Sequence, residues 1–409
     1  MKKSNCGARM KICFLVGSAH VSGGTYVINQ HAAWLQSQGH EVTIAPQMPF
    51  DEQTLAWHPE ARKLRHILLP EAANEKFDLV IATWWKTALE LPRFDAAQYA
   101  YFVQSIESRF YNEREVPLRA FVEKTYALDL PVITEATWIK AYLSERYGRN
   151  VFLARNGIRK DVYTPDGPRI APRPGRGKLR VLVEGPFGVF FKNVGRTVKL
   201  ARRSGADEVW LMTSSDVQWY PGVDRVFSRV PVEKTAEIYR SCDVIVKLSY
   251  VEGMFGPPLE MFHCGGTSIV YAVTGHDEYI VHDTNGLVTA SDDEERVVRY
   301  INELKNDPDK LERLKREALE TAQRWPSWGE ASSIFGDAVE AIMQQPKADR
   351  EALQRAIDDA WREYTLHETE RLKRTPSQTL IYKLSALVHR MPPSVSRRLQ
   401  QARYILESR

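Results

Sequence analysis

Two glutamates, Glu252 and Glu260, enclose a glycine-containing turn in the segment Glu252-Gly-Met-Phe-Gly-Pro-Pro-Leu-Glu260. The segment follows an apolar strand and opens a predicted helix, and a helix N-terminus offers unpaired backbone N–H groups and a positive dipole end. Such a loop can hold a diphosphate or sugar hydroxyls. Glu260 could then accept hydrogen bonds from a ribose diol, and Glu252 from a sugar hydroxyl. The competing interpretation is a strand-to-helix loop whose glutamates are surface or capping residues.

The surrounding elements repeat a strand–helix alternation along most of the chain. Residues 10–16 form a short apolar run, a Gly/Ser loop follows, a helical pattern runs over 25–38, and 41–45 reads as the next strand. This unit opens a Rossmann-like domain, and the alternation restarts at 179 after a Pro/Gly-rich stretch. We therefore predict an α/β protein with two Rossmann-like domains facing across a cleft, where ligands commonly bind.

Composition excludes several protein classes. Hydrophobic residues make up 43% and charged residues 26% of the 409, which is typical of a globular protein. The net charge of +4 is too mild to indicate a nucleic-acid partner. Four cysteines without a Cys-x-x-Cys pair favour a reducing, cytoplasmic compartment over a disulfide or zinc framework. No apolar run reaches about 18 residues, so no membrane span is predicted.

The Glu252–Glu260 segment resembles the E-x7-E motif of retaining glycosyltransferases of family 4, which have the GT-B fold. Further motifs of the family occur in the same order along this chain. Gly39-His40-Glu41-Val42 resembles the family's GHEV strand, Asn156-Gly157-Ile158 its NGV segment, and Asn285-Gly286-Leu287 its NGL segment. The resemblance covers about residues 10–345. Within it, the chain is similar to bacterial rhamnosyltransferases of surface-polysaccharide synthesis.

The resemblance implies a domain order. It predicts an N-terminal acceptor-side domain (1–164), a linker (165–178), a C-terminal nucleotide-sugar domain (179–325), a helix crossing back to the N-terminal domain (326–346) and a basic helical extension (347–409).

The resemblance also implies roles for single residues. Glu260 would bind the ribose and Glu252 the donor sugar, while Lys192 would neutralise the diphosphate that leaves. The other implied donor-binding positions are Gly23, Gly24, Arg229, Val230 and the backbone of Met254, Phe255 and Gly256. The competing interpretations are an exposed loop lysine for Lys192 and plain turn residues for the two glycines. No protein base is assigned, because the leaving phosphate can take the acceptor's proton in this fold.

Two departures from the family stand out. The arginine that usually precedes the lysine is absent from Glu184–Lys192, and Arg196 is the candidate substitute. The histidine expected near the donor sugar is replaced by Gln104, which can hydrogen-bond a sugar but cannot act as a base. Gln104 and Glu107 therefore join Trp84 and Trp85 as candidate acceptor-side residues. Aromatic side chains stack on sugars but also fill cores, so Trp84 and Trp85 keep both interpretations.

We expect neither a metal nor another cofactor. Asp307-Pro-Asp309 is formally a D-x-D pattern, but it opens a helix and reads as a cap. His263 and His276 lie near the motif and are interpreted as structural. The Gly17–Gly24 stretch lacks the G-x-G-x-x-G spacing of dinucleotide oxidoreductases.

The chain ends in a basic segment. Residues 371–409 contain nine Lys or Arg and one acid, with apolar residues at helical spacing. Such a segment suits the inner face of an anionic membrane, and the alternative is a helix packed on the body or on a partner.

The predicted function is transfer of a sugar, with rhamnose as the expected one, from a nucleotide sugar to a glycan or lipid-linked acceptor, with retention. The alternatives are a sugar-nucleotide epimerase of the same fold, and a non-catalytic scaffold whose basic tail binds a membrane or a partner.

Overall fold

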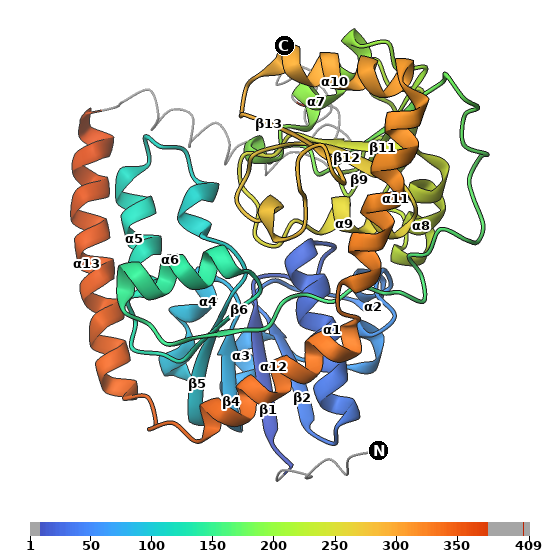
Figure 1. Cartoon of the computed structure of the whole chain (residues 1–409). Coiled ribbons are helices and arrows are strands. Elements are labelled where there is room, and N and C mark those ends of the chain that lie inside the picture. Colours follow the sequence, from blue (N-terminus) through green and yellow to red (C-terminus); the bar gives the residue numbers. More distant parts are fainter. Residues whose placement is uncertain (1–8, 375–403, 405–409) are drawn as a thin grey trace. The chain divides into compact units, whose positions relative to one another are not determined.

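The computed structural model describes residues 9–374 and Tyr404, and these form two compact units. Unit 1 consists of Met1–Arg159 with Pro326–Thr365, and unit 2 of Lys160–Trp325 with Leu366–Arg409. The predicted class, two Rossmann-like α/β domains with a helical C-terminal region, is confirmed (Figure 1).

Unit 1 is built on a seven-stranded parallel sheet with the strand order β3-β2-β1-β4-β5-β6-β7. Its strands are β1 (Lys11–Val16), β2 (Glu41–Pro46), β3 (Arg65–His66), β4 (Lys76–Ala82), β5 (Asp95–Val103), β6 (Val132–Thr134) and β7 (Val151–Leu153). Short strands buried on both faces read as continuous apolar runs, which is why the sequence pattern predicted β1 and β2.

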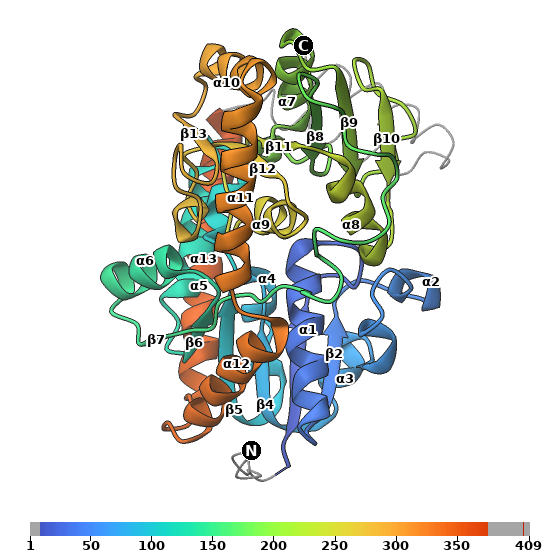
Figure 2. The same ribbon diagram turned by 45° about the vertical axis from the view of Figure 1, so that its right-hand side comes forward.

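Helices cover both faces of this sheet. They are α1 (Gly23–Ser37), α2 (Glu52–Leu55), α3 (Leu69–Ala72), α4 (Trp85–Ala88), α5 (Val116–Tyr126), α6 (Thr137–Tyr147), α12 (Trp328–Met343) and α13 (Arg350–Arg374). Ile12 and Phe14 of β1 face α1 and α12, which lie side by side in Figure 2. Cys13 and Leu15 point to the opposite face, where α4, α5 and α13 pack.

Unit 2 repeats the architecture with a six-stranded parallel sheet of order β10-β9-β8-β11-β12-β13. The strands are β8 (Arg180–Glu184), β9 (Glu208–Thr213), β10 (Arg225–Ser228), β11 (Val244–Lys247), β12 (Thr267–Tyr271) and β13 (Leu287–Thr289). The helices are α7 (Val194–Arg203), α8 (Val232–Ser241), α9 (Gly256–His263), α10 (Glu294–Asn306) and α11 (Pro308–Arg324).

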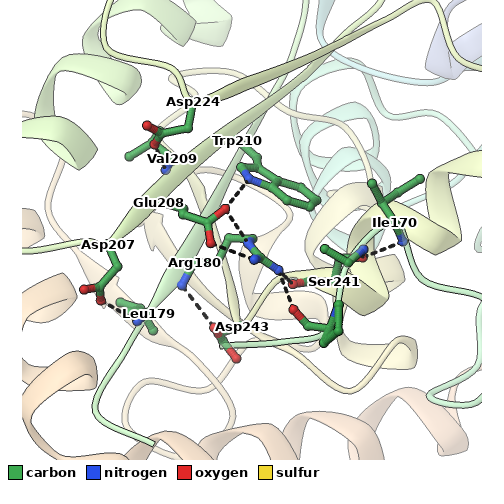
Figure 3. Close-up of polar contacts among 12 residues, drawn as sticks. Ile170, Leu179, Arg180, Asp207, Glu208, Val209, Trp210, Asp224, Ser241 and Asp243 are labelled. Carbon is green, nitrogen blue, oxygen red and sulfur yellow. Dashed lines mark hydrogen bonds and ion pairs between the residues drawn. The ribbon is translucent and has the colours of Figure 1, made fainter. Parts of the chain in front are cut away.

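Aspartates fix the amino-terminal edge of the unit 2 sheet (Figure 3). The carboxylates of Asp207, Asp243 and Asp224 accept hydrogen bonds from the backbone N–H groups of Leu179, Arg180 and Val209 at 2.8, 3.0 and 2.7 Å. These N–H groups lie within one residue of the first residue of β8 or β9, and the carboxylates satisfy them there.

Arg180 completes this edge. Its guanidinium forms a bidentate pair with Glu208 at 2.7 and 3.0 Å, and lies over the ring of Trp210 at 4.3 Å (Figure 3). Only 7% of its side chain is exposed, and a buried guanidinium requires such partners.

The segment 165–178, predicted as a linker, is attached to unit 2. The backbone N–H groups of Ile170 and Ala171 donate to Ser241 Oγ, and Arg173 donates to the carbonyl oxygen of Gly265 at 2.7 Å. The change from unit 1 to unit 2 therefore falls earlier, between Arg159 and Lys160.

Among the described residues, no helix is both long and apolar enough to cross a membrane.

Candidate functional site

The strand order of unit 2 places two loops together. The order reverses between β8 and β11, and open α/β sheets bind ligands beyond the carboxyl ends of their strands at such a switch point. β8 ends at Glu184 and β11 ends at Lys247, so the loops 185–192 and 248–255 leave the sheet from neighbouring strands.

Four charged side chains alternate in sign at this point. Lys247 Nζ lies 2.5 Å from Glu184 Oε2 and 3.8 Å from Glu252 Oε1. Lys192 Nζ lies 2.7 Å from Glu252 Oε2. The exposed fraction of the side chain is 3% for Lys247 and 7% for Glu252, against 20% for Glu184 and 22% for Lys192, so the two middle groups are buried and the two ends are partly exposed.

Glu252 is a buried, charged acceptor in this row. Burial raises its pKa, but the ammonium groups of Lys192 and Lys247 outweigh burial and hold the pKa below its usual value. Its Oε1 atom is buried and accepts no hydrogen bond. Buried polar atoms are rarely left unpaired, so this oxygen suits a hydroxyl donated by a ligand.

Glu260 lies beside a tyrosine pair. Tyr239 Oη donates to Glu260 Oε2 at 2.9 Å, and Tyr163 packs against Tyr239 with ring centroids 6.0 Å apart. Burial raises the pKa of Glu260 to about 7, with the hydrogen bond from Tyr239 opposing the shift and the charge of Glu184 adding to it. Glu260 can therefore change its protonation state near neutral pH.

The backbone between the two glutamates offers fewer donors than expected. The N–H of Gly256 already donates to the carbonyl oxygen of Met254 at 2.9 Å, and the next two helical residues are prolines without an N–H. Phe255 is fully buried and its carbonyl oxygen accepts from Tyr279. Any backbone donation to a ligand would thus come from the loop before α9 and not from its first turn.

Other residues expected at the donor site lie on its loops or point elsewhere. Arg229 is exposed, has φ of 53° and pairs with Asp216 at 3.6 Å, and Val230 beside it is half-buried. Arg196, the candidate substitute for the missing arginine, pairs with Glu294 of α10. His276 Nδ1 lies 2.6 Å from the Val273 carbonyl oxygen, and burial lowers the pKa of His263 to about 4.

The capping interpretation of Asp307-Pro-Asp309 is confirmed. Asp307 accepts a hydrogen bond from the N–H of Lys310 at 2.9 Å and caps α11. In the part of the chain that the structure describes, no three His, Cys, Asp or Glu side chains are grouped as they would be to hold a metal ion.

Unit 1 has a second cluster at its own switch point, between β1 and β4. Trp84 follows β4 and is half-buried, and a β-carbon at Gly17 would lie 2.6 Å from its ring. A β-carbon at Gly24 would lie 3.3 Å from both terminal atoms of Gln104, and Gln104 Oε1 is buried without a hydrogen bond. Glycines at both positions therefore allow the backbone to approach these side chains closely. Nothing lies within 4 Å of the β-carbon position at Gly23.

The structure separates the four predicted acceptor-side residues. Trp85 and Glu107 are both 4% exposed and lie in the core. Trp85 donates through Nε1 to Tyr111 Oη at 2.9 Å, and its backbone N–H donates to Glu107 Oε2 at 2.8 Å. Burial raises the pKa of Glu107 to about 8. These contacts give both residues a structural role, which leaves Trp84 and Gln104, both half-buried, as the less enclosed pair.

Comparison with known proteins identifies part of unit 2. Residues 224–321 match the family "Glycosyl transferases group 1". The chain is also 26% identical over 225 residues to the O-antigen biosynthesis protein RfbC of Myxococcus xanthus, a match that covers 52% of this chain and 17% of that protein. The chain thus spans about a sixth of the length of this relative.

Solved structures share the fold at low identity. Sucrose-phosphate synthase from Thermosynechococcus elongatus has a TM-score of 0.67 at 17% identity, covering 82% of this chain and 99% of that one. HepE from Anabaena, solved in complex with UDP-glucose, has a TM-score of 0.62 at 14% identity, covering 82% and 100%. The fold is GT-B, as predicted.

Sequence reasoning missed two members of the charged row. Lys247 lies inside the group 1 segment, whereas Glu184 lies before it. A signal was present, because Val244-Ile-Val-Lys247 is an apolar strand that ends in a lysine, and a buried lysine needs a carboxylate partner. The partner could not be identified, because it comes from a strand about 60 residues earlier.

Proposed function

We propose that this protein is a glycosyltransferase that uses a nucleotide sugar as donor. The observation that carries the proposal is the charged row Glu184–Lys247–Glu252–Lys192 beside Glu260, at the carboxyl ends of β8 and β11. This arrangement offers a cation at one partly exposed end, a buried carboxylate oxygen without a hydrogen bond beside it, and a second carboxylate on α9. The group 1 family match of residues 224–321 supports the same conclusion.

Each part of the row suits a part of such a donor. Lys192 is the most exposed cation and would neutralise the diphosphate, whose negative charge grows as the bond to the sugar breaks. Glu252 would accept from a hydroxyl of the donor sugar through Oε1, and Glu260 from the ribose. We propose retention of configuration, with the leaving phosphate taking the acceptor's proton.

The likeness to an O-antigen biosynthesis protein favours bacterial surface-polysaccharide synthesis as the setting. The proposed acceptor is a glycan or a lipid-linked oligosaccharide, with Trp84 and Gln104 on the acceptor side, and rhamnose is the proposed sugar. We further propose a cytoplasmic enzyme at the inner face of the membrane. Residues 375–403 and 405–409, which carry most of the basic tail, lie outside the described residues.

A thermal-shift panel of UDP, GDP, dTDP, ADP and CDP tests the donor site. A ligand at 100 times its Kd stabilises a protein by about 2.7 kcal/mol, which is measurable. We expect one nucleoside diphosphate to raise Tm clearly. The shift should vanish in Glu260→Ala and weaken in Lys192→Ala. Lys199→Ala, an exposed lysine of α7, is the matched control and should keep the full shift.

The alternatives give different results in the same experiments. A non-catalytic scaffold predicts no shift with any nucleotide. An epimerase predicts turnover of a nucleotide sugar without an acceptor. A shift that Glu260→Ala leaves intact would contradict the donor site proposed here.

A further inference from the structure

Lys247 is an unusual strand residue. It ends β11, whose other residues are Val244, Ile245 and Val246, and it is 3% exposed. A buried ammonium group is costly unless it is paired. A β-carbon at Gly185 would lie 2.9 Å from Val194 Cγ2 and 3.8 Å from Lys247 Nζ, so the β8 loop closes directly over the lysine.

Both carboxylates around Lys247 belong to the charged row. Glu184 anchors it at 2.5 Å, and its Nζ also lies 3.3 Å from the Glu184 carbonyl oxygen. Burial lowers the pKa of Lys247, but Glu184 and Glu252 outweigh burial and raise it, so the lysine is charged at neutral pH. Lys247 therefore has a fixed position and a fixed charge.

Lys192 is different, because it is the outer and more exposed cation of the row. In the protein alone, its closest partner is Glu252 Oε2 at 2.7 Å. A diphosphate offers several oxygen acceptors with more charge than one carboxylate, and Lys has a flexible four-carbon stem. Once Lys192 turns to the diphosphate, Glu252 loses its nearest cation while it stays buried.

We propose that Lys247 is a positioning residue that keeps the Glu252 carboxylate ionised and in place when the diphosphate draws Lys192 away. The inference rests on the proposed function. It explains why a second lysine is buried behind Glu252, where it is too enclosed to be the main phosphate contact. It also gives the glutamate the charge it needs to accept from a donor-sugar hydroxyl.

Other groups act on Glu252 or on Lys247, and their effects must be separated from the pairing of these two residues. Against the effect of burial, Lys192 and the Ser249 hydroxyl lower the pKa of Glu252. Tyr279 lies near enough to feel the charge of Glu252, and Glu184 and Glu260 act on Lys247. Burial raises the pKa of Tyr279 well above its usual value, so it stays neutral. Glu260 itself titrates near neutral pH, but it contributes equally to the affinity for a nucleotide and to the affinity for its sugar conjugate. The terminal phosphate of the bare nucleotide also titrates at about pH 6, whereas the sugar conjugate has no such group, so the ratio of the two affinities depends on pH even in wild type. Dividing the ratio of each variant by the wild-type ratio at the same pH removes this contribution and isolates Glu252.

The test measures this ratio by calorimetry between pH 5.5 and 8 in wild type and Lys247→Met. The probes are UDP with UDP-glucose and dTDP with dTDP-rhamnose, using the pair that binds. The wild-type ratio at each pH is the reference, and the ratio of each variant is divided by it to give a normalised ratio. In Lys247→Met the advantage of the sugar conjugate should fall about tenfold for each unit by which the pKa of Glu252 exceeds the pH. Affinity for the bare diphosphate should change less than about threefold at pH 8.

Three further variants distinguish a positioning role of Lys247 from a contribution of Lys247 to folding stability. Lys247→Arg should restore a constant normalised ratio. Lys315→Met removes another buried lysine of the same unit, paired with Asp243 just before β11 at 3.5 Å, and should lower Tm without a pH effect on the normalised ratio. Glu184→Gln leaves Lys247 paired with Glu252 alone, so the normalised ratio should stay constant. If Lys247→Met does not fold, Glu184→Gln still tests whether Lys247 holds the Glu252 carboxylate without Glu184.

The outcomes are distinguishable. If neither pair binds to wild type and no nucleoside diphosphate of the thermal-shift panel raises Tm, the proposed function fails, and this inference fails with it. If another nucleotide of the panel raises Tm, that nucleotide and its sugar conjugate become the probes. If a pair binds but Lys247→Met keeps a constant normalised ratio, or loses both ligands equally, Lys247 does not position Glu252. An acid-sensitive normalised ratio in Glu184→Gln would also overturn the proposal.

Discussion

At the scale of single residues, the two motif glutamates have opposite electrostatic settings. Glu252 lies between two lysines, which hold its pKa below the usual value, whereas burial raises the pKa of Glu260 to about 7. Close spacing in sequence thus gives one carboxylate that is charged throughout the physiological range and one that titrates within it.

This difference predicts pH-dependent binding of a nucleotide sugar, whose diphosphate has no group that titrates near neutral pH. A ribose diol donates hydrogen bonds, so it prefers the ionised form of Glu260. Affinity should be greatest above pH 7 and fall as the pH drops through 7, by about tenfold between pH 8 and 6. Titration calorimetry in buffers of different ionisation enthalpy should show proton release on binding at pH 6.5. Glu260→Gln should bind weakly and without this pH dependence. Equal affinities at pH 6 and 8 in wild type would contradict the assignment.

At the scale of elements, α12 docks on unit 1 through a close backbone contact. Ile158 pairs with Ser327 as an isolated bridge, and its N–H donates to the Pro326 carbonyl oxygen at 3.1 Å. A β-carbon at Gly157 would lie 2.5 Å from backbone atoms of Ser327 and Trp328. Backbone cannot move aside as a flexible side chain can, so only glycine fits at this position.

The prediction is that Gly157→Ala destabilises unit 1 by about 1–3 kcal/mol, the usual cost of overpacking. Gly329→Ala is the control, because its β-carbon would meet only Ser327 Oγ at 3.9 Å in the first turn of α12. Alanine there should be neutral or stabilising by up to about 1 kcal/mol. Urea unfolding of both variants measures the difference. Equal stabilities would show that the contact at Gly157 can relax.

At the scale of the whole molecule, both units are discontinuous, since unit 1 resumes at Pro326 and unit 2 at Leu366. All described strands of unit 2, however, lie between Lys160 and Trp325. Helix α12 supplies Phe335 and Val339 to one face of the unit 1 sheet, and Phe335 stacks on His31 with centroids 4.2 Å apart. On the other face, Tyr364 of α13 stacks on Phe121 at 4.9 Å. The first 159 residues therefore lack part of the cover of both faces.

We accordingly predict that residues 160–325 fold when expressed alone, whereas residues 1–159 do not. Circular dichroism and urea titration should show a cooperative transition for the first fragment and none for the second. Co-expression with residues 326–374 should rescue the second fragment. Cooperative unfolding of a monomeric 1–159 fragment would show that α12 and α13 are dispensable.

The sequence by itself determined the class, most strands and the two motif glutamates. Apolar runs and glycine loops are local patterns, and the chain follows them closely: β1 and β2 lie within one residue of the predicted bounds, while α1 begins two residues early at Gly23. The two-residue strand β3 went unpredicted, because so short an element has no periodicity.

Only the tertiary structure decided which polar residues are buried and with what partners. Trp84 and Trp85 are neighbours in sequence, yet one is half-buried beside Gly17 and the other lies in the core. Lys247 meets Glu184 because β8 and β11 are adjacent in the sheet, although 62 residues lie between them in the chain. Burial and pairing depend on strand order, and strand order is a property of the whole fold.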